Sequence, residues 1–297
     1  GSWHNNKNVS KKWDFEYNYN DYALAFNQLQ MLGGDLMHSK GLRGDGIIIA
    51  VIDAGFYMVN EIERFSNLQN QILGTYDFVD GELNVYDDHT HGMMVLSVMG
   101  LKGDVMGSAP DAKYLLLRSE DVFSENLIEE FMWICAAEYA DSSGADIINS
   151  SLGYTTFDDL SQNHTYHDMD GQTTPISIGA GIAYGKGMII VNSAGNYGNS
   201  DWYHIAAPAD NIDVLTVGAV DENRNIASFS SYGLNTQLVV KPNVVAQGKN
   251  TVLVNSSNEV VVGNGTSFSS PIIAGMTACL WGANLDQSNF NIKEAIY

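Results

Sequence analysis

Four polar residues stand at the ends of apolar segments, where a side chain can be held firmly and still meet a ligand. Asp53 follows an apolar run that starts at Ile47, and His91 precedes another apolar segment. Asn196 follows a third such segment, and Ser267 lies among small residues before a fourth. A histidine that takes the proton of a serine makes it a nucleophile, an aspartate orients such a histidine, and an asparagine amide can donate to an oxyanion. These residue types make acyl transfer one candidate chemistry for the four positions.

Each of these residues also has an ordinary structural interpretation. An aspartate before Gly55 is typical of a turn, and asparagine is common in turns as well. His91 alone is typical of a solvated loop. Ser267 alone is typical of a helix N-cap, although a hydroxyl there also meets the positive end of the helix dipole. The argument for chemistry therefore rests on the four residues together.

A second chemical interpretation concerns the pair His89 and His91, because a His-x-His sequence can bind zinc. Residues two apart do not share a helix face, and no further ligand follows at close spacing. A metal-dependent hydrolase built on these histidines remains an alternative.

The elements that must position these residues alternate between strand and helix patterns. Apolar runs predict buried strands over Ile47–Asp53, Lys113–Leu117, Asp146–Ser151, Met188–Asn192 and Val214–Val220. Helical spacing predicts helices over Asp21–Leu32, His91–Met99, Ser124–Gly144, Ile176–Tyr184 and Ser267–Trp281. Gly33 and Gly34 are expected to close the first helix, and Ser124 is expected to cap the third. Pro271 is expected in the first turn of the last helix. Such alternation predicts an α/β fold of three layers, α/β/α, around a mostly parallel sheet. In these sheets ligands bind at the carboxyl ends of strands.

Composition excludes several classes of protein. The 297 residues are 45% hydrophobic, which is too apolar for a disordered chain, and 14 basic against 35 acidic residues give a formal net charge of −21. Such a charge repels nucleic acids and anionic membrane surfaces. We expect no membrane span, because no apolar stretch approaches the ~20 residues that one needs. Two cysteines are too few for a disulfide framework.

Domain organisation is expected to be simple. Residues 1–20 are polar and aromatic and predict an extended arm whose first residues, Gly1 and Ser2, are typical of a cloning remnant. Residues 21–297 are expected to form one domain. No signal peptide is visible. Glycosylation sequons begin at Asn8, Asn149, Asn163, Asn255 and Asn264, and two of them fall in the candidate site, which favours a host such as a bacterium that leaves them unmodified.

Five local sequences around these residues occur together and in a characteristic order. They are Val51-Ile52-Asp53-Ala54-Gly55, His91-Gly92, Asn149-Ser150-Ser151-Leu152-Gly153, Ser193-Ala194-Gly195-Asn196 and Gly265-Thr266-Ser267-Phe268-Ser269-Ser270-Pro271. Together with Ala227-Ser228-Phe229-Ser230-Ser231 they resemble the signature blocks of the subtilases, the subtilisin-like serine proteases, of bacterial type. Asp-His-Ser is the order of the triad in subtilisin. The resemblance covers about residues 25–285.

The resemblance implies a role for each matched position. Ser267 is the expected nucleophile, His91 the general base and Asp53 the residue that orients His91, while Asn196 and the Ser267 backbone N–H form the oxyanion hole. The substrate is expected to pair with Ser151, Leu152 and Gly153 and to contact Ser193, Ala194 and Gly195. The implied activity is that of a serine endopeptidase acting through an acyl-enzyme. No cofactor is expected for the chemistry.

Several positions depart from the family pattern. Ala54 replaces the usual Thr or Ser after the aspartate, and Met93 replaces a threonine near the catalytic histidine. Lys241-Pro242-Asn243-Val244-Val245-Ala246-Gln247-Gly248 also differs from the usual sequence. The stretch from Tyr154 to Pro175 is unusually long and is expected to lie beside the substrate strand. The chain ends 30 residues after Ser267, where the family usually continues, so we expect the natural protein to be longer.

The family also implies partners and an ion. Peptide or protein substrates and an inhibitory propeptide are the expected partners, and the expected location is secreted, periplasmic or on the cell surface. Asp168 and Asp170, before Gly171, have the spacing of calcium ligands, although a solvated acidic loop has the same pattern. An alternative function is a non-catalytic surface or interaction protein on a subtilase scaffold.

Overall fold

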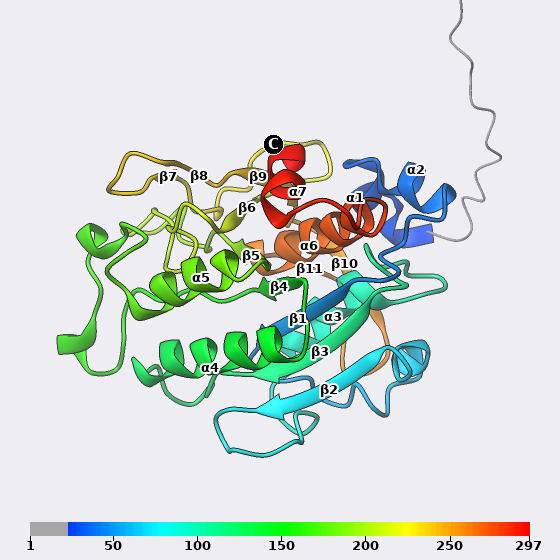
Figure 1. Cartoon of the computed structure of the whole chain (residues 1–297), viewed down its shortest axis with the longest axis horizontal. Helices are drawn as coiled ribbons and strands as arrows, with labels where there is room; N and C mark the ends of the chain where they lie inside the picture. The colour runs from blue at the N-terminus through cyan, green and yellow to red at the C-terminus, as the bar shows by residue number, and fades with distance from the viewer. Residues whose placement is uncertain (1–22) are drawn as a thin grey trace, which may run out of the picture.

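The computed structural model describes residues 23–297 and is built around a parallel sheet of seven strands, in the order β2-β3-β1-β4-β5-β6-β9 (Figure 1). The strands of this sheet are β1 (Ile48–Asp53), β2 (Ile72–Asp77), β3 (Lys113–Arg118), β4 (Ile147–Ser150), β5 (Ile189–Ser193), β6 (Leu215–Val220) and β9 (Val244–Gln247). Every neighbouring pair is parallel. All seven strands therefore end at one edge of the sheet, as the predicted fold class requires.

Helices cover both faces of this sheet, and the residues of β1 show why. Ile49 and Val51 belong to the larger core cluster, with residues of α3 (His91–Gly100) and α6 (Thr266–Gly282). Ala50 and Ile52 belong to the second cluster, with residues of α4 (Ile128–Ser142) and α5 (Pro175–Gly185). Alternate side chains of a strand point to opposite faces, so a continuous apolar run fills two cores. The three-layer α/β/α architecture is confirmed.

The remaining elements are short and lie around the sheet. They are α1 (Phe26–Gln30), α2 (Gly34–Ser39), α7 (Asn289–Ile296), the antiparallel pair β10 (Thr251–Val254) and β11 (Val260–Gly263), and the pair β7 (Gly233–Leu234) and β8 (Val240–Lys241). The sequence patterns did not predict β2, β9 or these small pairs. Among residues 23–297, no helix is both long and apolar enough to cross a membrane.

Helix α6 is buried along almost its whole length, with 15 of its 17 residues buried. Its expected start is confirmed to within one residue, but Pro271 lies at its sixth position and not in its first turn. A proline there removes the hydrogen bond to the carbonyl four residues earlier, which belongs to Ser267. The Ser151 hydroxyl donates to that carbonyl instead, at 2.9 Å.

Two other expected boundaries were wrong. For the helix predicted over Asp21–Leu32, the predicted start, Asp21, lies outside the described residues. At the other end, α1 ends at Gln30, before the predicted end at Leu32. Gly33 has a left-handed backbone (φ 73°), so it forms a turn from which α2 starts at Gly34. Ser124 does not cap α4, which begins at Ile128.

The carboxylate of Glu129 explains the later start of α4. It accepts hydrogen bonds from the backbone N–H groups of Asp121 and Asn126, at 2.8 Å each. The Ser124 hydroxyl donates to the Asp121 carboxylate and is therefore not available as a cap. Gly144 ends the helix as expected, with φ 79°.

Candidate active site

The sequence-predicted residues gather at the carboxyl edge of the sheet. Asp53 is the last residue of β1, and Ser151 directly follows β4. Asn196 lies three residues after the end of β5. His91 and Ser267 begin α3 and α6 at the same edge, and the rings of His91 and Phe268 lie 6.0 Å apart between centroids. Residues that are up to 214 positions apart thus meet because parallel strands end together.

Asp53 and His91 are joined directly. Asp53 is fully buried, and its Oδ1 lies 2.7 Å from Nδ1 of His91 and accepts a hydrogen bond from the Ala54 N–H at 2.8 Å. A carboxylate at Nδ1 favours the tautomer that leaves Nε2 unprotonated and able to accept a proton. Gly92 makes this contact possible, because a Cβ built there would lie 2.5 Å from the Gly55 carbonyl oxygen and 2.9 Å from the Asp53 Cβ.

Electrostatics favour the charged form of His91. Burial lowers the pKa of His91, but the charge of Asp53 and the hydrogen bond to it raise the pKa by more, so the net shift is upward. Burial and the nearby His91 lower the pKa of His89. Of these two histidines, whose pKa values shift in opposite directions, only His91 hydrogen-bonds to a carboxylate within residues 23–297.

The substitution of Ala54 for a hydroxyl residue has a visible effect. Oδ2 of Asp53 is buried and has no hydrogen-bond partner within residues 23–297. An unpartnered buried carboxylate oxygen costs free energy. The Asp53 carboxylate is therefore held through one oxygen only, where a neighbouring hydroxyl could have bound the other.

The side-chain amide of Asn196 has a defined orientation. Its Oδ1 accepts hydrogen bonds from the Thr266 N–H at 2.8 Å and from the Thr266 hydroxyl at 3.0 Å. Because both partners are donors at this oxygen, the amide cannot be flipped, and Nδ2 must point the other way. A Cβ built at Gly265 (φ 154°) would lie 3.7 Å both from Nδ2 and from the Ser267 backbone nitrogen. The two nitrogens thus flank one small space.

Ser267 and Ser151 bind each other twice. The Ser151 hydroxyl donates to the Ser267 carbonyl, as described above, and the Ser267 hydroxyl donates to the Ser151 carbonyl at 3.4 Å. The second bond is long and therefore weak. Within residues 23–297, no hydrogen bond joins the Ser267 hydroxyl to His91. The His91 ring instead lies 6.0 Å, between centroids, from the ring of Phe268, the residue after Ser267.

A pocket of about 170 Å³ adjoins the serine. It is lined by Ser151, Leu152, Gly153, Ser193, Gly195, Asn196, Tyr197 and Ser267. Of the residues expected to contact substrate, only Ala194 does not line it, because it is fully buried in a small cluster with Ile205 and Ala209. Sequence reasoning missed Tyr197, for which the only signal was its position directly after Asn196.

Beyond the pocket, Tyr154 connects the substrate strand to a buried acid. Its hydroxyl donates to Glu120, which also accepts from the Ser119 hydroxyl at 2.9 Å. Burial raises the pKa of Glu120 to about 8, and the nearby Glu129 adds to this effect. Glu120 is therefore protonated at neutral pH, and this wall of the site is held by neutral hydrogen bonds.

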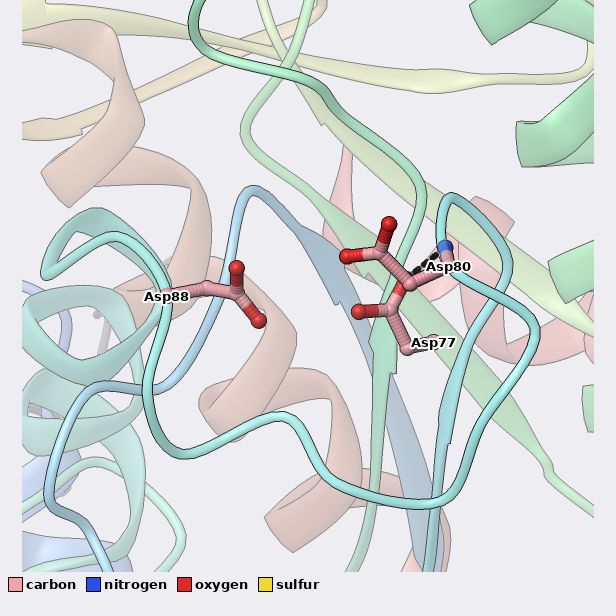
Figure 2. A group of neighbouring side chains, drawn as sticks. All are labelled: Asp77, Asp80 and Asp88. Atoms are coloured by element: carbon pink, nitrogen blue, oxygen red, sulfur yellow. Dashed lines mark hydrogen bonds between the residues drawn. The ribbon is translucent and has the colours of Figure 1, made fainter.

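A second acidic group lies on the other side, beside His91. Asp77, Asp80 and Asp88 form the only group of three potential metal ligands found within residues 23–297, and Figure 2 shows their carboxylates facing a common space. Nη1 of Arg118 lies 2.6 Å from Asp77, 2.7 Å from Asp80 and 3.2 Å from Asp88. The guanidinium supplies the positive charge that a metal would otherwise bring. Sequence reasoning identified neither Arg118 nor its partners.

The two expected calcium ligands, Asp168 and Asp170, each accept hydrogen bonds from residues of their own turn. Asp168 accepts hydrogen bonds from the backbone and side chain of Thr165, at 2.6 and 2.8 Å. Asp170 accepts from the backbone of Gln172 and from Thr173, so both carboxylates stabilise local turns. Neither belongs to a group of three potential ligands within residues 23–297, and calcium binding there stays a prediction.

Solved structures share this fold. A cold-adapted subtilisin-like serine proteinase matches with a TM-score of 0.67 and 22% identity, covering 85% of this chain and 81% of that one. MycP1 from the ESX-1 type VII secretion system matches with a TM-score of 0.67 and 23% identity, covering 90% of this chain and 78% of that one. At these identities the likeness concerns the fold alone.

Comparison of sequences goes further. A thermophilic serine proteinase of Bacillus sp. (strain AK1) is 31% identical over 262 residues, which are 87% of this chain and 57% of the relative. Serine protease AprX of Bacillus subtilis (strain 168) is 29% identical over 87% of this chain and 62% of its own length. The chain thus spans about three fifths of these two relatives. Subtilisin DY of Bacillus licheniformis is 27% identical, over 85% of this chain and 82% of its own length.

The family model described as "Subtilase family" matches residues 44–297, which include every residue placed in the site above. The matched range also contains all seven strands of the main sheet. It contains helix α3, which begins with His91, and helix α6, whose second residue is Ser267. By fold, by sequence and by the arrangement of Asp53, His91, Asn196 and Ser267, the chain belongs to the subtilase family.

Proposed function

We propose that the protein is a serine endopeptidase that cleaves peptide bonds through an acyl-enzyme on Ser267. The observation that carries this proposal is a pocket lined by Ser267 and Asn196, together with the bonded pair Asp53 and His91, whose imidazole lies 6.0 Å from the ring of Phe268, the residue after Ser267. A nucleophile, a base with its orienting carboxylate and an oxyanion donor are the groups that acyl transfer needs.

The first step moves a proton and forms a bond. The Ser267 hydroxyl leaves the weak 3.4 Å bond to Ser151, gives its proton to Nε2 of His91 and attacks the scissile carbonyl carbon. Asp53 stabilises the imidazolium that forms. The carbonyl oxygen becomes an anion in the space between Asn196 Nδ2 and the Ser267 N–H. His91 then protonates the leaving amine, and water repeats the sequence to release the acid.

The substrate backbone is expected to pair with the segment after β4. The N–H and carbonyl of Gly153 have no hydrogen-bond partner within residues 23–297, whereas the neighbouring Leu152 carbonyl accepts from the side chain of Asn192 at 3.0 Å. An extended peptide can satisfy Gly153 by adding a strand there, which provides affinity without selecting side chains. The Ser151 carbonyl, once released by Ser267, can accept a further N–H.

The test is the intact mass of the protein after exposure to a fluorophosphonate probe, with Ser267→Ala beside it. We expect one adduct on the parent, mapped to Ser267 and absent from the variant, and a loss of peptide turnover in the variant of about 10⁶-fold. Absence of the adduct from a folded parent would contradict the proposal and favour the non-catalytic scaffold.

A metal-dependent reaction at His89 and His91 predicts a different pattern. Chelator would abolish turnover, and Ser267→Ala would retain it. Chelator alone does not separate the two mechanisms, because removing a structural calcium would also inactivate a serine protease. The serine variant therefore decides.

The remaining features of the proposal rest on family membership. We propose that the protein acts outside the cytoplasm (secreted, periplasmic or on the cell surface), that a propeptide inhibits it before maturation, and that calcium stabilises it. Isothermal titration of calcium into the chelated protein, compared with the Asp168→Asn variant, tests the ion at the predicted position.

A further inference from the structure

The N-terminus of α3, which begins with His91, has no side-chain cap. Thr90 precedes the helix, and its side chain makes no capping hydrogen bond. The His91 N–H donates to the His89 ring at 3.3 Å, which is a long contact within the same short loop. An orphan helix end next to a proposed catalytic base requires some other restraint if the imidazole is to stay within reach of Ser267.

Arg118 is anchored to the same strand end as Asp53. It is the last residue of β3 and lies opposite Asp53 in the parallel register of β1 and β3. The next residue, Ser119, donates its N–H to the Asp53 carbonyl at 3.1 Å. The Arg118 side chain is 5% exposed, and its Nε donates to the Glu120 carbonyl at 3.2 Å. The guanidinium is therefore fixed relative to Asp53.

The guanidinium in turn holds the loop that leads to His91. Asp77 and Asp80 lie at and after the end of β2, whereas Asp88 lies three residues before His91 on the connecting loop (Figure 2). The ion pair between Arg118 Nη1 and Asp88 Oδ1, at 3.2 Å, is the link in this group that reaches the His91 loop. The Asp88 side chain is 22% exposed, so solvent screens this ion pair only partly.

The loop has little freedom to absorb a displacement of Asp88. Its backbone is bonded to the segment after Asp53, with Phe56 N–H donating to the Val85 carbonyl at 2.8 Å. Gly55 touches the loop so closely that a Cβ built there would lie 2.6 Å from both the Asp88 Cβ and the His89 nitrogen. Packed atoms transmit a shift rather than absorbing it.

We propose that Arg118 and Asp88 form a positioning pair that holds His91 against Asp53. This inference rests on the proposed function, because it assigns to His91 the task of accepting the Ser267 proton. The pair touches neither substrate nor the reacting atoms and acts only through the loop. Charged groups that face His91 directly are Asp53 and, across the same loop, His89.

Two matched variants test the pair, Asp88→Asn and Asp80→Asn. Each removes one carboxylate charge from the same guanidinium nitrogen without changing side-chain size, but Asp88 lies three residues before His91, whereas Asp80 lies eleven residues before it, just after β2. For both variants and the parent, the rate of fluorophosphonate labelling is measured from pH 5 to 9, and thermal unfolding is measured beside it. We expect Asp88→Asn to slow labelling by at least about tenfold, since small misplacements of catalytic groups are costly.

The pH profile separates positioning from general stability. In Asp88→Asn the acid limb should move towards pH 6.5, because a looser contact with Asp53 raises the pKa of His91 less. Asp80→Asn should label within about twofold of the parent with an unchanged limb. Equal effects of the two variants, or an Asp88→Asn variant that labels like the parent, would overturn the proposal.

A parent that folds but does not label would instead contradict the proposed function. In that case the titration of His91 is followed by NMR in the same three proteins, which needs no activity. A downward shift of the His91 pKa in Asp88→Asn alone would support the positioning pair, and equal titrations in all three would overturn it.

Discussion

Arg118 and Glu120 lie two residues apart at the end of β3, yet they support different walls of the site, one in a charged and the other in a neutral form. Burial lowers the pKa of Arg118, but hydrogen bonds to Asp77 and Asp80 raise it by more, so the guanidinium stays charged. The Glu120 carboxyl bonds instead to the neutral hydroxyls of Tyr154 and Ser119, and burial raises its pKa to about 8. The first wall holds His91 by ion pairs, and the second holds the substrate strand through the neutral Tyr154–Glu120 contact. The difference teaches that partners, and not burial alone, decide whether a buried group is charged.

The largest expected effect comes from removing the charge of Asp53, which pairs with His91. Asp53→Asn removes both influences that raise the pKa of His91 and leaves burial, which lowers it. We expect the labelling rate to fall by about 10⁴-fold and the acid limb of its pH profile to move to lower pH. Because His91 accepts a proton only when neutral, the limb of the parent should lie above the ordinary value of about 6.5.

Rate measurements at several pH values check this prediction. A parent limb below 6.5 would contradict the role of Asp53 in raising the pKa of His91. The control is Asp213→Asn, because Asp213 lies far along the chain in the segment before β6 and should leave the limb unchanged.

The next effect concerns Asn196, the proposed oxyanion donor. Asn196→Asp keeps an oxygen for the two Thr266 donors but loses the Nδ2 donor. We expect kcat to fall by about 10²–10³-fold with a much smaller change in KM, because the donor binds charge that develops only in the transition state.

Asn196→Ala is the matched comparison, since it removes the donor without adding a charge. Similar losses in kcat for the two variants would assign the effect to the missing donor. A loss confined to KM in both would contradict the oxyanion role of Asn196.

A smaller effect, on stability, concerns Glu120. Its pKa is about 8 in the folded protein and about 4.5 when unfolded, so between these values the folded state binds one more proton than the unfolded state. This contribution to the free energy of unfolding is complete below pH 4.5 and declines by about 1.4 kcal/mol per pH unit as pH rises towards 8.

Glu120→Gln should remove that decline while keeping the Tyr154 hydrogen bond. Denaturant unfolding at pH 5, 6.5 and 8 compares the two proteins. If the free energy of unfolding of the parent and of the variant depends on pH identically, Glu120 is not protonated in the fold.

The smallest effect concerns the unpartnered oxygen of Asp53. Ala54→Ser adds a hydroxyl beside Oδ2 and should increase the free energy of unfolding by about 1 kcal/mol, the usual net value of one hydrogen bond. Thermal unfolding measures this change, and a comparison of Ala54→Thr with its isostere Ala54→Val controls for added bulk, because only the threonine carries a donor. A stabilisation equal in both variants would indicate packing instead.

Local sequence predicted the residues of the candidate site but not the ion-pair partners that support them. Asp53, His91, Asn196 and Ser267 could be predicted because each lies in a short block whose neighbours are small or apolar, and because parallel strands must end at one edge. Arg118 could not, because its carboxylate partners lie 30 to 41 residues away and meet it only through the register of three strands. No pattern within one segment encodes such a contact.

The misplaced start of α4 has a similar cause. Ser124 was a reasonable cap by residue type, but the competing acceptor is Glu129, which satisfies two backbone N–H groups before the helix. The choice between the two depends on where the loop after Glu120 runs. That path is set by the Arg118 and Tyr154 contacts, which belong to tertiary structure.

The burial of α6 determines when the molecule can become active. Ser267 stands on a helix that packs against α3 and against β4, β5, β6 and β9, and every one of these strands precedes it in the chain. During synthesis the aspartate and the histidine therefore emerge long before the serine, and the site stays incomplete until α6 has inserted. On the proposed mechanism, a nascent chain of this order carries no assembled active site beside the ribosome, because the proposed nucleophile is synthesised after the other three site residues.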